Sequence, residues 1–106
     1  MEKKVHHYHL TLQYTQDNQN NPVSQPAVEL DFTNHDNIFA IIDRLKDRQL
    51  FEQESDATEF AIGLKLFSEV MIRNRKHPLF EDFAPAFSDF MKKLKSGSPE
   101  NSGKST

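Results

Sequence analysis

Two helix-period apolar segments joined at a proline turn fill residues 60–95 and constrain the fold more than any other feature. In the first segment, apolar residues recur every three or four positions, which is the spacing of one helix face. They are Phe60, Ala61, Leu64, Phe67 and Met71, with Ile62, Leu66 and Val70 on a neighbouring face. A helix that is apolar over so much of its circumference must be covered on more than one side.

Short signals set the ends of this helix. Asp56 and Glu59 have the spacing of a capping box, which favours a helix start near Ala57. Pro78 restricts the residue before it to extended geometry, so the helix is expected to end near Arg75. A glycine in the helix interior, Gly63, costs about 1 kcal/mol relative to alanine. We expect the close approach of another backbone to compensate for it.

Two further helices are expected on either side of this one in the sequence. Asn34 can cap a short helix over residues 36–48, with Asp36 at the positive end of its dipole. Pro85 suits the first position of a last helix, where its missing N–H costs little. The last helix carries an apolar stripe and a basic C-terminal end: Phe87, Phe90, Met91 and Leu94, then Lys92, Lys93 and Lys95.

The N-terminal third of the chain has a period of two, which is typical of strands with one buried face. The alternating apolar residues are Tyr8, Leu10, Leu12 and Tyr14 in one run, and Val28, Leu30 and Phe32 in another. Residues 16–25 between them are rich in Asn and have no periodicity, which indicates a loop. The two runs therefore predict a long-looped antiparallel hairpin.

The order of elements is ββααα, an α+β fold in which an N-terminal antiparallel β-hairpin is followed by three helices. An isolated two-stranded hairpin is marginal in water, so its apolar face is expected to pack on the helices or on a second copy of the chain. Residues 1–95 are expected to form a single domain. Residues 96–106 contain only small, polar or charged side chains and are expected to form a disordered tail.

Composition excludes several classes of protein. The 106 residues contain no cysteine, which rules out disulfides and thiolate metal sites and fits a reducing compartment. The charged start Met1-Glu2-Lys3-Lys4 is followed by an alternating polar pattern rather than the continuous apolar run of a secretory signal, and no apolar run approaches the ~20 residues that span a bilayer. We therefore expect a soluble, cytoplasmic protein with no membrane partner.

Charge argues against a nucleic-acid partner. The net charge is −3, and residues 60–106 carry eight basic against five acidic groups. Strong nucleic-acid binders usually have a net basic balance or a long basic stripe. This small basic excess stands beside an acidic middle, with three basic and seven acidic groups in residues 34–59.

The sequence also resembles a known family. The residues that carry the resemblance are the run Phe60-Ala61-Ile62-Gly63-Leu64-Lys65-Leu66-Phe67-Ser68-Glu69-Val70-Met71, the Asn74–Pro78 turn, Leu79-Phe80, Phe90-Met91-Lys92-Lys93-Leu94-Lys95, and Asn34-His35-Asp36 before Ile38-Phe39-Ala40-Ile41. Over about residues 5–95 these are similar to a family of small uncharacterised bacterial proteins that is classed as a domain of unknown function. The resemblance implies bacterial origin and a domain that spans the whole chain. It implies no catalytic residues.

Histidines supply the first candidate site. His7 and His9 share one strand face and can ligate a metal through their imidazole nitrogens. Depending on the strand register, Glu29 or Asp31 faces His9 and supplies an oxygen ligand or a hydrogen-bonding partner. We take His7, His9 and Asp31 as the candidate metal site. The alternative is that these histidines are solvated and pair with carboxylates across the strands.

The proline turn supplies the second candidate site. Arg73, Arg75, Lys76 and His77 form a basic cluster, hereafter the basic hinge, which can hold a phosphate or an acidic partner. It lacks a glycine-rich phosphate loop and an aromatic platform for bases. The alternative is that these cations only stabilise the negative end of the helix dipole.

No reaction is indicated by the sequence. His77 can act as a general base only if Glu81 or Asp82 orients it, and no nucleophile lies in an activating motif. We expect a non-catalytic interaction module without a cofactor, whose partner is a second copy of the chain or another protein. The alternative is a small-ligand, anion or metal binding protein that uses the histidines and the basic hinge.

Overall fold

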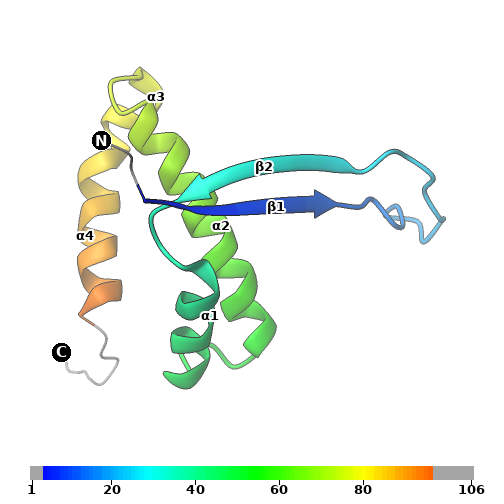
Figure 1. Cartoon of the computed structure of the whole chain (residues 1–106), viewed down its shortest axis with the longest axis horizontal. Coiled ribbons are helices and arrows are strands. Elements are labelled where there is room, and N and C mark those ends of the chain that lie inside the picture. Colours follow the sequence, from blue (N-terminus) through cyan, green and yellow to red (C-terminus); the bar gives the residue numbers. More distant parts are fainter. Residues whose placement is uncertain (1–3, 97–106) are drawn as a thin grey trace. The chain divides into compact units, whose positions relative to one another are not determined.

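Residues 4–96 are described in the computed structural model of the chain, which contains two strands and four helices (Figure 1). They are β1 (His6–Leu12), β2 (Val28–Asn34), α1 (Ile38–Asp47), α2 (Glu54–Arg73), α3 (Pro78–Glu81) and α4 (Phe83–Lys95). The chain forms two compact units, residues 1–37 and residues 38–106. The predicted α+β class with an N-terminal hairpin is confirmed. Residues 97–106, nearly all of the predicted tail, lie outside the described part.

The first unit is the hairpin, in which β1 and β2 pair antiparallel. Its register places Tyr8 opposite Phe32, and Leu10 opposite Leu30, so that the apolar residues share one face, as their alternation predicted. The Tyr8 and Phe32 rings stack with centroids 5.2 Å apart. Toward the loop the same face is open, because Leu12 and Val28 are 65% and 62% exposed.

Asp17 organises the long loop of the hairpin. Its carboxylate accepts hydrogen bonds from the backbone N–H groups of Gln19 and Asn21, both at 2.9 Å. These two bonds lower the pKa of Asp17. Asn20 between the two donors has a positive φ of 68°, which asparagine tolerates better than most residues. The loop is therefore a defined turn, although the sequence alone indicated only the absence of periodicity.

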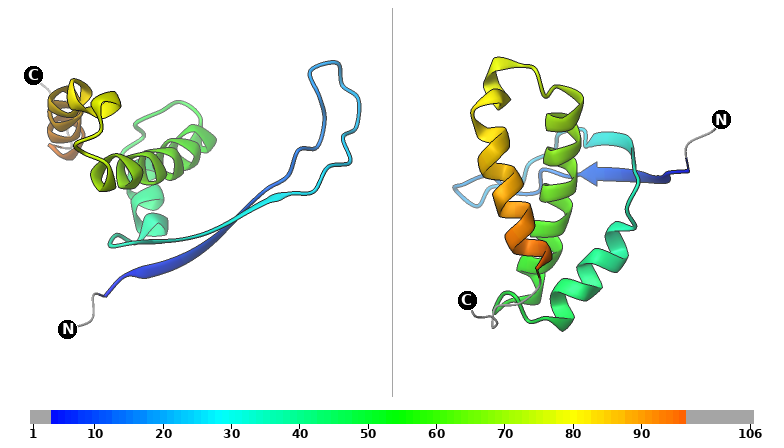
Figure 2. Two further views of the ribbon diagram at one scale, coloured as in Figure 1. Left: turned by 90° about the horizontal axis from the view of Figure 1, so that it is seen from above. Right: turned by 90° about the vertical axis from the view of Figure 1, so that its left-hand side faces the viewer.

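The second unit is helical, and α2 is its central element. Figure 2 shows α4 running back alongside α2, with α1 on another side of α2. The buried centre consists of Leu45 from α1 with Ala57 and Ala61 from α2, which are 4%, 2% and 0% exposed. Partly buried neighbours pack against it: Ile41, Ile42, Leu50, Phe51, Phe60 and Leu94. Two alanines on α2 allow α1 to approach closely because they occupy little volume.

The end of α1 explains how the chain turns back toward α2. The N–H of Leu50 bonds the carbonyl of Leu45, and the N–H of Gln49 bonds the carbonyl of Lys46. Gln49 has the left-handed φ of 52° that this Schellman arrangement requires. Leu50 and Leu45 both belong to the core cluster, which supplies the hydrophobic contact that accompanies the motif.

The prediction of three helices is wrong, because a one-turn helix, α3, lies between the two long ones. Pro78 occupies its first turn, and the ring of His77 caps it by accepting the N–H of Leu79 at 3.0 Å. These two features stabilise a helical turn where the sequence suggested an irregular apolar one. Asp82 then ends α3 and precedes α4.

Several predicted helix boundaries are also wrong. Helix α2 begins at Glu54 rather than Ala57, and Gln53 precedes it without a side-chain cap, so Asp56 lies in the first turn instead of forming a capping box. Helix α1 begins at Ile38, because the side chain of Asn34 accepts the N–H of Asp36 in a local turn before the helix. Helix α4 begins two residues before Pro85, which occupies its first turn.

Among residues 4–96, no helix is long and apolar enough to cross a membrane. This holds for α2, the longest helix, because charged residues interrupt its apolar faces.

Gly63 has no neighbour of the kind that the sequence suggested. A Cβ atom added at Gly63 meets nothing within 4 Å among the described residues. The prediction that another backbone packs there is therefore wrong. Gly63 instead leaves open space on an exposed part of α2.

We expect Gly63→Ala to stabilise the unassociated chain by about 1 kcal/mol, because alanine has a higher helix propensity and restricts the unfolded chain. Urea unfolding followed by circular dichroism, at a protein concentration at which the chain is monomeric, measures this gain. A loss of stability instead would mean that the space beside Gly63 is filled in solution.

Candidate functional site

The outer face of the hairpin holds His9 between two carboxylates. His9 lies directly opposite Asp31 in the register, and its Nδ1 is 2.6 Å from a carboxylate oxygen of Asp31. Its Nε2 is 2.6 Å from a carboxylate oxygen of Glu29, which also accepts the hydroxyl of Thr11 at 2.8 Å. Both ring nitrogens can donate only when the imidazole is protonated. The arrangement therefore favours the imidazolium form.

These contacts shift the pKa of both partners in opposite directions. Hydrogen bonds to Asp31 and then Glu29 raise the pKa of His9 above its ordinary value of 6.5. Hydrogen bonds from Thr11 and then His9 lower the pKa of Glu29 below 4.5. Because the side chains of His9 and Glu29 are 55% and 53% exposed, salt and water screen their attraction.

We expect the hairpin to be most stable between these two shifted pKa values. The contribution of His9 is complete below 6.5 and is lost as the pH rises through its raised pKa. The contribution of Glu29 is complete above 4.5 and is lost as the pH falls through its lowered pKa. Amide exchange of β1 and β2 across this range measures the effect.

NMR titration of His9 in Asp31→Asn should give a lower pKa than in the original chain, because the variant removes one of the two carboxylates that favour the protonated ring. An unchanged pKa would contradict the contact between His9 and Asp31.

The same geometry bears on the candidate metal site. His9 and Asp31 are brought together, whereas His7, two residues along the strand, lies opposite Thr33. Among residues 4–96, no group of three or more His, Asp or Glu side chains is arranged to hold a metal ion. Both nitrogens of His9 are engaged by carboxylates, so a metal would have to displace at least one of them.

At the basic hinge, His77 has a structural task. Its Nδ1 accepts the N–H of Leu79, so this nitrogen is unprotonated and the proton of the neutral ring is on Nε2. Its backbone N–H bonds the carbonyl of Asn74 at 2.8 Å, and its ring lies edge-on to Phe80. A His77 that caps α3 is not available as a general base through Nδ1.

The cations of the basic hinge are exposed. Arg73 is the last residue of α2, and Arg75 and Lys76 follow its C-terminal cap. Within the described residues, none of the three forms an ion pair. They are therefore positive charges at the end of a helix with no counter-ion among residues 4–96.

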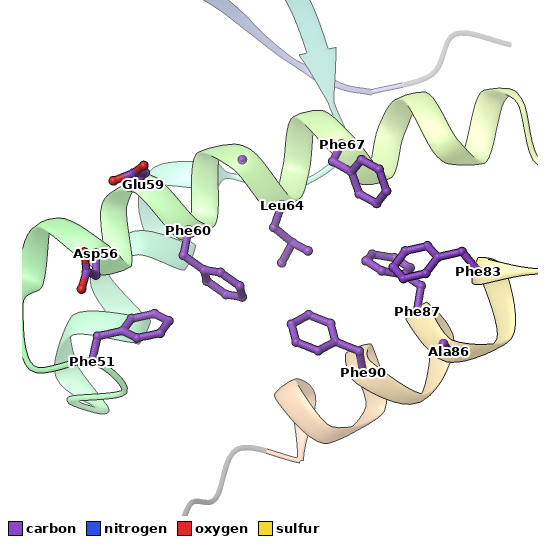
Figure 3. A pocket seen from close by; sticks show the side chains of 11 residues that line it. Phe51, Asp56, Glu59, Phe60, Leu64, Phe67, Phe83, Ala86, Phe87 and Phe90 are labelled. Carbon is purple, nitrogen blue, oxygen red and sulfur yellow. The ribbon is translucent and has the colours of Figure 1, made fainter. Parts of the chain in front are cut away.

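A hollow in the helical unit lies elsewhere, between α2 and α4, and we call it the Phe groove. Its volume is about 770 Å³. In Figure 3, Phe60, Leu64 and Phe67 extend from α2 toward the rings that α4 contributes. The complete lining is Phe51, Phe60, Gly63, Leu64, Phe67, Phe83, Ala86, Phe87 and Phe90, with Asp56 and Glu59.

The rings of the Phe groove contact one another but do not close it. Phe60 and Phe90 meet edge-on at 6.2 Å, and Phe67 and Phe87 at 5.9 Å. Phe67, Phe83 and Phe90 nevertheless remain 42%, 44% and 42% exposed. No residue of α4 is buried. The groove is thus an apolar surface open to water, which is uncommon on a chain that acts alone.

Sequence reasoning missed the Phe groove because it assigned every phenylalanine of these helices to a buried core. A signal was present in the composition, since nine of the 106 residues are phenylalanine and a chain of this size has a small interior. The predicted site residues of the basic hinge are not part of the groove lining.

Comparisons with known proteins agree with this fold. A family described as a domain of unknown function with a solved structure, DUF3861, matches residues 6–96. A crystal structure of a protein of unknown function from Pectobacterium atrosepticum is 30% identical, with a TM-score of 0.75. The match covers 88% of this chain and 99% of that one. No curated protein matches the chain.

Proposed function

The chain belongs to the DUF3861 family of domains of unknown function, and we propose that it is a small cytoplasmic interaction module that associates with itself and catalyses no reaction. The exposed Phe groove is the observation that carries this proposal. Burying apolar surface contributes roughly 25 cal/mol per Å², and Phe67, Phe83 and Phe90 each leave more than two fifths of their surface in water. Association of two chains can remove that surface from water.

The hairpin offers a second apolar surface for the same purpose. Leu12, Val28 and Leu30 are 65%, 62% and 44% exposed on one face of a sheet with only two strands. Such a sheet gains stability when its apolar face is covered, by helices or by the hairpin of a second copy. A four-stranded sheet formed by two copies is the form of self-association that uses this surface.

Sedimentation velocity over a range of protein concentrations tests the proposal. We expect a dimer whose dissociation constant rises at least tenfold in Phe83→Ser, because serine removes an exposed ring from the Phe groove. Leu79→Ser is the matched control, since Leu79 is 72% exposed on α3 and does not line the groove. A chain that stays monomeric at millimolar concentration would refute self-association.

The alternative function is binding of a metal or an anion by the histidines and the basic hinge. Arg73, Arg75 and Lys76 are the observation in its favour, because they are exposed and form no ion pair with any residue in the described part of the chain. Calorimetric titration with Zn²⁺ and with inorganic phosphate tests it. No heat of binding at micromolar ligand would remove this alternative, and saturable binding that Arg75→Glu abolishes would support it.

A further inference from the structure

One stripe of α2 is turned away from the core and has a definite polarity. Asp56, Glu59, Gly63, Phe67, Val70 and Arg73 follow one another at spacings of three and four residues, so they share one face of the helix. We call this stripe the open face. All six are exposed, and Phe67 and Val70 at its centre are each 42% exposed.

The centre of the open face combines a hollow with a projecting ring. Gly63 leaves space where any other residue would place a side chain, since a Cβ there meets nothing within 4 Å among the described residues. Phe67 lies one helical turn further along, and its ring meets those of Phe80, Phe83 and Phe87 on one side and stays 42% exposed on the other. A helix that crosses here can place a large side chain over Gly63, and its own small residue can receive Phe67.

The two ends of the open face carry opposite charges. Asp56 and Glu59 lie in the first turns of α2, whereas Arg73 ends the helix and Arg75 follows it. Among residues 4–96, no ion pair joins any of these four side chains to another.

From this complementarity we propose that the open face receives the α2 helix of a second copy, packed antiparallel across a two-fold axis. The proposal rests on the self-association proposed above and names the surface that performs it. With the axis midway between Gly63 and Phe67, each Phe67 lies over Gly63 of the other copy. Asp56 and Glu59 then lie on either side of Arg73 of the second copy. A two-fold interface repeats this contact, so opposite charges meet at both ends.

Other occupants fit the open face less well. A parallel second copy would set carboxylates against carboxylates and cations against cations, which is repulsive. Residues 97–106 contain no Val, Leu, Ile, Met or aromatic side chain that could fill an apolar groove. The antiparallel copy alone satisfies the apolar centre and the two charged ends together. It also places carboxylates of the second copy beside the cations of the basic hinge.

Charge reversal with rescue tests the proposal by sedimentation velocity. One variant carries Asp56→Lys with Glu59→Lys, and the other carries Arg73→Glu with Arg75→Glu. Each variant alone sets like charges together at both ends, so we expect its dissociation constant to rise at least tenfold. An equal mixture restores opposite charges at both ends, so we expect a heterodimer about as stable as the original dimer. Salt at 0.5 M should reduce these differences.

Controls separate this proposal from the more general one. Asp43→Lys with Asp47→Lys makes the same change of charge on exposed positions of α1, and we expect it to leave association unchanged. Thermal unfolding confirms that each variant is folded. If the original chain is monomeric at every concentration, self-association and the open face both fail. If it dimerises and both charge reversals leave the dimer unchanged, or if their mixture does not recover, only the open face is overturned.

Discussion

Leu45→Ala is expected to lower the free energy of unfolding by about 3 kcal/mol. Leu45 is 4% exposed and packs on Ala57 and Ala61 at the contact between α1 and α2. The loss combines the apolar transfer of the removed atoms with the cavity they leave, and short alanine side chains cannot move to fill that cavity. For a domain whose total stability is about 5–15 kcal/mol, this is a large fraction.

Urea unfolding followed by circular dichroism, at one protein concentration for all variants, measures this loss. Leu79→Ala removes the same atoms from a side chain that is 72% exposed, and it should change stability by less than about 0.5 kcal/mol. If the two variants were equally stable, the contact between α1 and α2 would not form the core of the helical unit.

Arg48→Ala is expected to destabilise the chain by about 2 kcal/mol, because hydrogen bonds from charged donors are worth more than neutral ones. Nη1 of Arg48 donates to the backbone carbonyl of Leu94 at 3.3 Å. This bond joins the residue that follows α1 to the last turn of α4, where a positive charge also favours the helix dipole. The variant therefore removes a direct polar link between these two helices.

Arg48→Met separates the effect of the hydrogen bond to Leu94 from the effect of the apolar part of the Arg48 side chain. Nε of Arg48 is buried and has no hydrogen-bond partner in the described structure, which is unfavourable in a low-dielectric interior. Methionine keeps the apolar stem and removes this nitrogen, so we expect it to recover at least half of the loss. Native-state hydrogen exchange of the α4 amides provides the second measurement. If exchange in α4 were unchanged in Arg48→Ala, the bond to Leu94 would not form in solution.

Periodicity predicted the parts of the fold in which local pattern and tertiary packing agree. The alternation from Tyr8 to Leu12 identified the hairpin face, but it left open whether Glu29 or Asp31 lies opposite His9, which the register decides in favour of Asp31. The long apolar pattern of α2 was equally clear. What periodicity could not supply was the chain conformation at the ends of elements. The cap by His77 and the left-handed Gln49 depend on single side chains and single φ angles.

The Phe groove escaped prediction for a different reason. A stripe such as Phe83, Phe87 and Phe90 has the same spacing whether it is buried or only faces another helix. Sequence shows which face of a helix is apolar but not how closely a neighbour approaches it. That distance depends on side-chain size across the interface, and rings meeting rings hold α2 and α4 apart.

The absence of any buried residue in α4 bears on how this helix moves and not only on where it lies. We expect an element held by half-exposed rings, by Leu94 and by the bond from Arg48 to open at a lower free energy than the α1–α2 core. The width of the Phe groove is then expected to fluctuate, with wide and narrow forms coexisting in solution. A partner that binds only the wide form has an apparent affinity that is reduced by the fraction of molecules in which α4 has moved away from α2.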